Sequence, residues 1–153
     1  MKNITTFIYE SMKDALQKIQ SKLENNQDMI ISGRFGRNEE QKLITLAKKN
    51  GYADAITVYA DKMESEDLSP IGNAVPQWAQ PILDNKNKKY LLIFAFDNIA
   101  RDTMQAVMPL FLKHLVMGKS VKNMNWCIAA KNINDIPQAV LSRAGGEHDI
   151  ITL

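Results

Sequence analysis

The chain has 153 residues, enough for one domain with a hydrophobic core and too few for two ordinary domains. We therefore predict a single domain over residues 1–153. Its hydrophobic content of 45% and charged content of 24% are average for a globular protein. The net charge of +2 is too small to indicate a nucleic acid or an anionic membrane as partner.

Cysteine and histidine usage argues against disulfide and metal chemistry. Cys127 is the single cysteine, lies in an apolar run, and is expected to be a buried, inert thiol. His114 and His148 have no spacing typical of a metal site. The N-terminus lacks the apolar core of a signal peptide, and no apolar run approaches membrane-spanning length. We therefore expect a cytoplasmic protein with no metal and no membrane partner.

Hydrophobic periodicity and turn residues divide the first half of the chain into helices and strands. The predicted elements are a helix over about 5–24, a strand over 29–32, a helix over about 38–49 and a strand over 55–59. A long polar connection follows. Later, Lys86, Lys88 and Lys89 form a basic run, for which a solvated loop is the simpler interpretation.

The second half continues the alternation of strands and helices. The predicted elements are strands over 90–96 and 125–130, helices over about 103–115 and 135–142, and a terminal strand over 149–153. The strand over 90–96 is almost continuously apolar, which is typical of a parallel strand buried on both faces. Pro109 should kink or tighten its helix, and Pro137 falls in the first turn of its own. This pattern predicts an α/β sheet.

A glycine loop with Gly33 and Gly36 follows the first strand and has the layout of a phosphate-binding P-loop. In that motif, G-x-x-x-x-G-K-[ST] follows a strand and opens a helix. Counting from Gly33, the second glycine falls on Asn38, the lysine on Glu39 and the hydroxyl residue on Glu40. Because two carboxylates stand where a cation and a magnesium ligand belong, a triphosphate would meet like charge there.

Three later segments add ordered landmarks. Residues 91–101 read Leu-Leu-Ile-Phe-Ala-Phe-Asp-Asn-Ile-Ala-Arg, residues 125–132 end in Lys-Asn, and residues 139–143 read Ala-Val-Leu-Ser-Arg. They resemble the Walker B region, the strand ending in the sensor asparagine, and the arginine-finger run of AAA+ ATPases of the MoxR-like and dynein-related branch. Residues 56–72, with Trp78 and Pro81, resemble the second strand, turn and aromatic insert of that branch. The resemblance covers most of residues 5–153.

The resemblance implies a three-layer P-loop NTPase-like sandwich with a five-stranded parallel sheet in the order 5-1-4-3-2, without the family's C-terminal lid domain. The Walker B aspartate corresponds to Asp97, but the catalytic glutamate corresponds to Asn98, and a neutral amide cannot act as a general base. The degenerate nucleotide-site positions are Gly33, Gly36, Asn38, Glu39, Glu40, Asp97, Asn98 and Asn132. Arg101 and Arg143 are retained and are candidate subunit-interface residues.

We therefore expect a catalytically inactive AAA+-like domain, with no catalytic residue and no cofactor, that acts as a protein-interaction or regulatory module. Its partner would be a second copy of the chain or an active AAA+ relative. One alternative is residual binding of ATP and Mg²⁺ through the loop amides of residues 33–38 and Asp97. Another is an accessory protein for nucleic acid or for a phage or mobile element, although the charge argues against nucleic acid.

Several of these residues also have a simpler structural interpretation. Asp97 could cap the following helix, Asn132 could be an ordinary loop residue, and Arg143 could be a surface residue at a helix C-terminus. Trp78 is expected either to form a protein-binding lip or to pack on its own domain. The acidic residues of the polar connection fit helix capping better than a metal cluster: Glu64, Glu66 and Asp67. The methionines near the long second-half helix fit a core better than an interface: Met104, Met108 and Met117.

Overall fold

The computed structural model describes residues 4–64 and 75–153, so Glu66 and Asp67 lie outside the described residues. The α-helices are α1 (Ile4–Glu24), α2 (Arg37–Lys49), α3 (Gln80–Asp84), α4 (Arg101–Lys113) and α5 (Gln138–Arg143). The strands are β1 (Met29–Ser32), β2 (Asp54–Tyr59), β3 (Tyr90–Phe96), β4 (Leu115–Val116), β5 (Lys119–Ser120), β6 (Met124–Ala130) and β7 (Ile151–Thr152). Short 3₁₀ helices occur at Ala60–Lys62, Ile133–Asp135 and Glu147–Asp149.

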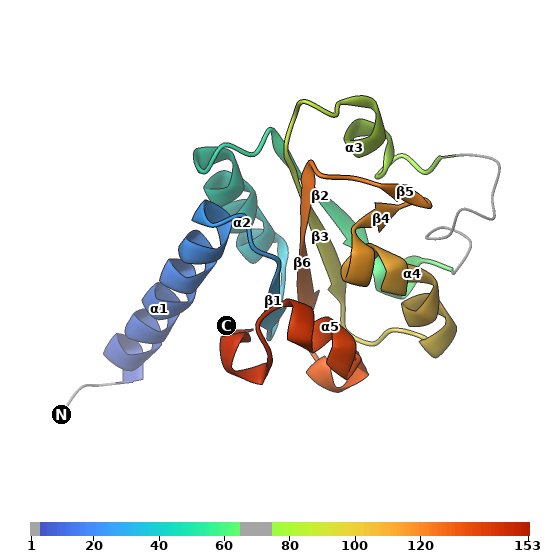
Figure 1. Ribbon diagram of the computed structural model, residues 1–153. Coiled ribbons are helices and arrows are strands. Elements are labelled where there is room, and N and C mark those ends of the chain that lie inside the picture. The colour runs from blue at the N-terminus through green and yellow to red at the C-terminus, as the bar shows by residue number, and fades with distance from the viewer. Residues whose placement is uncertain (1–3, 65–74) are drawn as a thin grey trace.

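Five of the strands form one parallel sheet in the order β2-β3-β6-β1-β7, which confirms the predicted α/β class (Figure 1). The element numbers differ from the expected 5-1-4-3-2 because the hairpin of β4 and β5, absent from the prediction, precedes β6 in the chain. Numbered along the chain within this sheet alone, the strands read 5-1-4-3-2 from the β7 edge.

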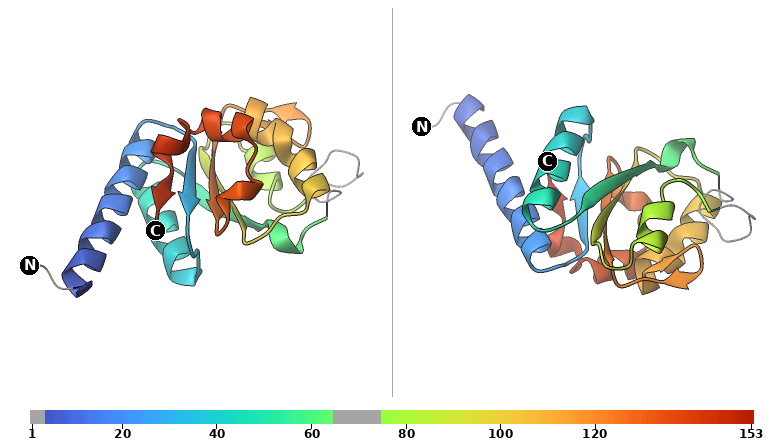
Figure 2. Two further views of the ribbon diagram at one scale, coloured as in Figure 1. Left: turned by 90° about the horizontal axis from the view of Figure 1, so that it is seen from below. Right: turned by 90° about the horizontal axis from the view of Figure 1, so that it is seen from above.

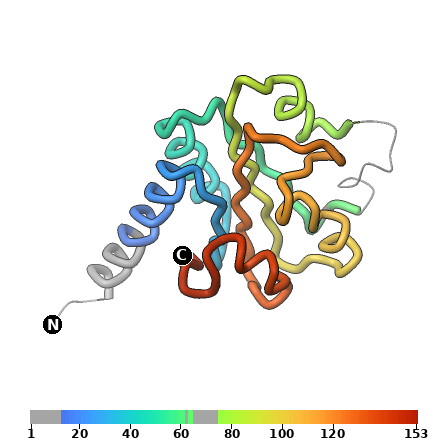
Figure 3. Tube along the Cα trace, in the orientation of Figure 1, coloured from blue at the N-terminus to red at the C-terminus, as the bar shows by residue number. Residues whose placement is uncertain are grey.

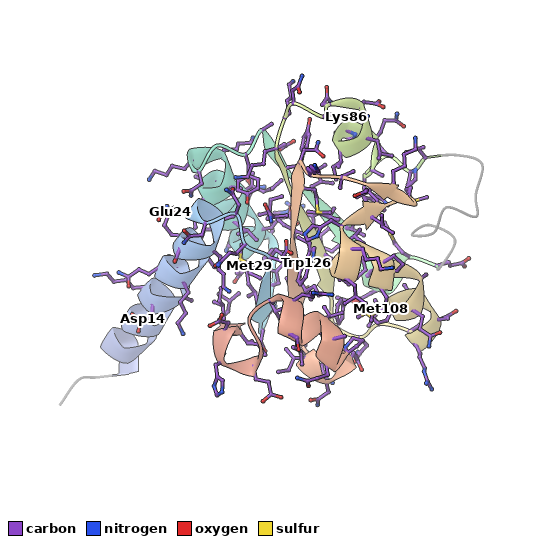
Figure 4. The ribbon with its side chains drawn as sticks, in the orientation of Figure 1. Asp14, Glu24, Met29, Lys86, Met108 and Trp126 are labelled. Atoms are coloured by element: carbon purple, nitrogen blue, oxygen red, sulfur yellow. The ribbon has the colours of Figure 1, made fainter. Side chains whose placement is uncertain are left out.

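Helices cover both faces of the sheet (Figures 1 and 2). On one face α1 and α2 pack against alternate residues of β3, namely Leu91, Ile93 and Ala95. On the other face α3, α4 and α5 pack against Leu92, Phe94 and Phe96. Figure 4 marks this division, with Met29 toward the α1 side and Trp126 toward the α4 side. All seven β3 residues are buried, as the continuous apolar run predicts.

The boundaries of the longer elements agree with the sequence to within two residues, and the short elements account for the differences. The short helix predicted over 135–142 is replaced by a 3₁₀ turn and then α5, for which Pro137 is the N-cap rather than a first-turn residue. The terminal strand is only Ile151–Thr152 because Glu147–Asp149 forms a 3₁₀ turn. The end of the chain nevertheless lies beside β1, with which β7 pairs (Figure 3).

Two elements were not predicted from the sequence. Helix α3 has five residues and is too short to show a helical period. The hairpin of β4 and β5 has two residues in each strand, joined by Met117 and Gly118, whose φ angles are 50° and 80°. Two consecutive positive φ angles are the signature of a type I′ hairpin turn.

The structure decides between the core and surface interpretations of Trp78 and the methionines. Trp78 is buried in the core on the α4 face, so it packs on its own domain. Met104 is buried in the same core, and Met108 and Met117 pack against it, as the core interpretation predicts. None of the described helices combines the length and the apolar character needed to cross a membrane.

Candidate functional site

The loop between β1 and α2 comprises residues 33–36, because the helix already begins at Arg37. Gly33 has a φ of +132°, and a Cβ built there would lie 3.1 Å from the carbonyl oxygen of Leu153. Its N–H donates to the carbonyl oxygen of Ala130 at 3.0 Å, which extends the pairing of β1 with β6. Gly33 is therefore required by the backbone path, and its amide is already used within the sheet.

The N-terminus of α2 is occupied by carboxylates of the chain itself. Gly36 is the N-cap, and its N–H donates to Oε2 of Glu39 at 3.0 Å. Glu40, one residue further along the first turn, accepts a hydrogen bond from the hydroxyl of Tyr59. The N-terminus of a helix attracts anions through its free amides and its dipole. Here the helix end that a P-loop would present to phosphate carries Glu39 and Glu40, and Glu39 bonds its N-cap amide.

The bond to Glu40 also affects Tyr59, which ends β2. Hydrogen bonding to Glu40 raises the pKa of the Tyr59 phenol; burial and the charge of Glu40 add to this, and Arg37 opposes it. Tyr59 is a large exposed side chain, with 46% of its surface accessible. Its hydrogen bond to Glu40 joins the end of β2 to the first turn of α2 at the carboxyl edge of the sheet.

A hollow of about 150 Å³ lies at the carboxyl ends of the parallel strands, where ligands bind in open α/β sheets. Its charged lining consists of Asp61, Asp97 and Lys131, and Phe35 and Tyr59 form aromatic walls. Ligand pockets usually measure roughly 300–1,000 Å³, so this hollow is small for a nucleotide. Two carboxylates against one ammonium also give it an acidic balance, which opposes phosphate binding.

Asp97 does not have the helix-capping role considered from the sequence. Its N–H donates to both carboxylate oxygens of Asp61, at 3.0 and 3.1 Å, and the N-cap of α4 is Ala100. The N-cap interpretation of Asp97 was therefore wrong. Among the residues that the structure describes, no three His, Cys, Asp or Glu side chains come together as a metal-binding group.

The remaining predicted nucleotide-site positions lie at the carboxyl edge of the sheet. Asn98 and Asn132 are exposed just beyond β3 and β6, and Asn132 Oδ1 accepts from the N–H of Asn134 at 3.0 Å, as a residue that starts a turn does. Asn38 is exposed in the first turn of α2. These residues share the carboxyl edge of the sheet with Gly33, Gly36, Glu39, Glu40 and Asp97.

The two arginines lie apart. Arg101 is the exposed first residue of α4. Arg143 is the last residue of α5, which packs against α4, and it is close enough to His114, the C-cap residue of α4, for its charge to lower the pKa of that histidine. Since α4 has 13 residues, its ends are about 20 Å apart. The structure does not bring the two candidate interface arginines together.

A polar network near the amino ends of the strands was missed in the sequence. Asp28, directly before β1, accepts hydrogen bonds from the N–H of Trp126 at 3.0 Å and the side-chain amide of Asn125 at 3.1 Å. Its other oxygen lies 2.9 Å from Nε2 of His114. The bond to Asp28 raises the pKa of His114, although burial opposes the shift. These partners come from three separated segments, so only the three-dimensional fold brings them together.

Two neighbouring groups are affected by this network and by burial. Burial raises the pKa of Tyr52 to about 12, and the charge of Asp28 contributes. Burial, with Asp28 again contributing, also raises the pKa of the Cys127 thiol, which is fully enclosed. Cys127 is therefore a buried thiol with little thiolate character, as its apolar neighbours predict.

A scan against models of known protein families found no match to this chain, and a search of curated protein sequences found none either.

Tyr59, Asp61 and Lys131 complete the hollow but were not among the predicted site residues. A usable signal was present, because each of them ends or closely follows a parallel strand and such positions meet at one sheet edge.

Proposed function

We propose that this chain is a catalytically inactive, AAA+-like domain that acts as a protein-interaction module. The observation that carries the proposal is the hydrogen bond from the Gly36 amide to the carboxylate of Glu39. The Glu39 carboxylate takes the N-cap amide, which is one of the groups that a helix N-terminus would otherwise offer to a phosphate. If the sheet is kept while the phosphate-binding position is taken by the chain itself, we expect the domain to function by binding a partner protein at its surface.

The charge and size of the edge hollow support the same conclusion. Among the described residues that line the hollow, Asp61 and Asp97 are accompanied by one cation, Lys131, and Glu39 and Glu40 lie on the neighbouring helix turn. Asn98, at the position of the catalytic glutamate, cannot accept a proton from water as a carboxylate does. We therefore expect no nucleotide hydrolysis and no stable nucleotide complex.

The runner-up function is an unorthodox nucleotide-binding protein, and one observation favours it. Lys131 lines the hollow beside Asp97, so it could supply the cation that the loop lacks. In that case Lys131 would contact phosphate and Asp97 would face the accompanying Mg²⁺. A variant without the Lys131 charge distinguishes the two functions, because only the nucleotide-binding protein would lose a ligand contact.

Thermal unfolding with and without Mg-ATP tests the proposal. A ligand at about 100 times its dissociation constant stabilises a protein by about 2.7 kcal/mol, which raises Tm by several degrees in a domain of this size. We expect no shift, and no ATP turnover above a buffer control. A shift that disappears in Lys131→Met, or a turnover of about 0.1 per second that disappears in Asp97→Ala, would establish the runner-up instead.

The interaction half of the proposal needs its own measurement. Affinity capture from the native host, followed by titration of the purified partner against the purified chain, should give a saturable complex that forms without nucleotide. Capture of nothing beyond a bait-free control, or a complex that requires Mg-ATP, would contradict the proposal.

A further inference from the structure

A groove of about 480 Å³ lies between α3 and the chain around β5, at the end of the molecule away from the P-loop-like edge (Figure 1). Apolar side chains form its floor, namely Ile82, Leu83 and Val121. Three exposed lysines surround this floor: Lys86, Lys119 and Lys122. Figure 4 labels Lys86 beside α3.

The two walls of the groove are fixed to each other by Asn123. Its side-chain amide nitrogen lies 3.0 Å from the carbonyl oxygens of Ile82 and Lys88 and 3.1 Å from that of Asn85. The backbone carbonyl oxygen of Asn123 accepts from the N–H of Tyr90 at 2.8 Å, which joins this wall to β3. The groove is therefore preformed, and binding would not require its walls to be ordered first.

The hairpin places the lysines of the second wall. Val121 N–H donates to the carbonyl oxygen of His114 at 3.1 Å, which ties the strand after the turn to the end of α4. The type I′ turn at Met117 and Gly118 then sets Lys119 directly opposite Val116. Local turn geometry thus brings Lys119 and Lys122 to the same groove as Lys86, which is more than 30 residues earlier in the chain.

The lysines of the groove have no compensating charge of their own. No carboxylate is among the described residues that line it, and no ion pair joins its three lysines to any described acid. Asp84, on α3, keeps its charge, but it accepts a hydrogen bond from the side chain of Gln80 at 2.7 Å and is not among the residues that line the groove. A chain with a net charge of only +2 therefore concentrates positive charge around one apolar floor.

We propose that this groove docks an acidic segment of a partner protein, with apolar side chains of that segment on the floor and its carboxylates against the lysines. This inference rests on the proposed interaction function and names the chemistry of the partner. Nucleic acid is disfavoured because the described residues of the lining include neither an aromatic side chain, on which bases stack, nor an arginine, which reads base edges and phosphates bidentately. An apolar floor with a polar, solvent-accessible rim has the layout of protein interfaces, and the charge of the rim sets the sign of the partner.

A labelled peptide tests the inference directly. The probe has about twelve residues, mostly glutamate, with leucine at every fourth position, and a companion peptide replaces each glutamate with glutamine. Fluorescence anisotropy at about 50 mM and about 300 mM salt measures binding, since screening weakens exposed charge pairs. The groove variant combines Lys86→Glu, Lys119→Glu and Lys122→Glu. The matched control reverses three exposed lysines on α1 and α2: Lys13→Glu, Lys18→Glu and Lys49→Glu.

We expect the acidic peptide to bind the wild-type chain, and the groove variant to bind it about tenfold more weakly, while the control variant binds normally. Circular dichroism melting confirms that both variants fold. Absence of peptide binding, equal binding of the glutamine peptide, or equal weakening by both variants overturns the inference. So does a duplex of about twelve base pairs that binds more tightly than the peptide through the same lysines.

The result is separable from the proposed function. A captured partner protein that binds the groove variant as well as it binds the wild type leaves the interaction function standing and overturns the groove as its site. A Mg-ATP complex dependent on Lys131 would contradict the proposed function whatever the peptide does.

Discussion

At the scale of single residues, Glu39 engages the N-cap amide at the start of α2. A glutamate at the third helical position that reaches back to the N-cap amide is one half of a capping box, and it also complements the helix dipole. The same amide and dipole would otherwise be available to an external anion. One carboxylate therefore stabilises the helix and removes a phosphate-binding group.

This role predicts different effects for two substitutions at one position. Glu39→Ala should lower the free energy of unfolding by about 1 kcal/mol, because the Gly36 amide loses its acceptor. Glu39→Gln keeps an acceptor and should cost less than half as much. Urea unfolding measures both, with Gln41→Ala, an exposed position on the same helix, as the control. If Glu39→Ala were no more destabilising than Gln41→Ala, the capping role would be wrong.

His114 gives a prediction for pH dependence. Hydrogen bonding to Asp28 raises its pKa above the ordinary value, with Arg143 and burial opposing. Its contribution to stability is therefore complete below the unfolded pKa of about 6.5 and is lost as pH rises through the higher folded pKa. The wild-type chain should therefore lose this stabilisation as pH rises above about 6.5.

The variant His114→Asn should lack that dependence, and asparagine tolerates the left-handed backbone at this position, where φ is 52°. Unfolding midpoints in urea, measured across the pH series, make the comparison. His148→Asn removes an exposed histidine and should keep the wild-type profile. A pH profile unchanged by His114→Asn would show that the pair with Asp28 contributes nothing to the dependence.

At the scale of elements, the sequence was most informative where a pattern is long. The seven apolar residues of β3 identify a strand buried on both faces without any tertiary information. The two-residue strands β4 and β5 are too short to show an alternation of apolar and polar residues. The turn between them is also hard to predict, because Met117 occupies a position of positive φ where Asn, Asp or Gly is usual, and only Gly118 matches the type I′ pattern. Sequence reasoning found the glycine loop and Asp97, because both follow predicted strands directly. It missed Asp61 and Tyr59, although both end or follow β2 at the same sheet edge, because neither belongs to the P-loop and Walker B positions on which the site prediction rested.

The contact between β6 and α4 gives a prediction at this scale. Trp126 is fully buried, its Nε1 donates to the carbonyl oxygen of Phe111 at 3.2 Å, and its ring meets the Phe111 ring edge-on at 5.1 Å. Trp126→Phe removes the donor and leaves a cavity, so it should lower the free energy of unfolding by about 2 kcal/mol. Met124→Leu, a volume-conserving change in the same strand, should cost less than about 1 kcal/mol. Equal values in chemical denaturation would contradict the assignment of the tryptophan as the anchor between these elements.

At the scale of the whole molecule, the two ends of the parallel sheet have different chemistry. The carboxyl edge gathers carboxylates at the P-loop-like hollow, whereas the far end carries the lysine groove between α3 and β5. This separation is compatible with a generic nucleotide-binding-like α/β fold. It also means that a partner in the groove need not approach Glu39 or Asp97.

The same arrangement bears on self-association. A contact between copies that replaces a bridging nucleotide with an ion pair would join Arg143 of one copy to Glu39 and Glu40 of the next. Arg143 is exposed, but Glu39 and Glu40 each already accept a hydrogen bond within the chain through Oε2, so an arginine from another copy would have to share these carboxylates. Exposed ion pairs contribute at most about 1 kcal/mol, which is too little to hold copies together.

We therefore expect the chain alone to sediment as a monomer at low and at high salt, and Arg143→Glu to leave its sedimentation unchanged. Sedimentation velocity over a range of concentrations makes the measurement. The opposite outcome is specific: a concentration-dependent assembly that Arg143→Glu breaks, and that Glu39→Arg with Glu40→Arg in the same chain partly restores. Restoration by charge reversal would require the two surfaces to face each other, and homotypic assembly would then replace a separate partner as the role of this fold.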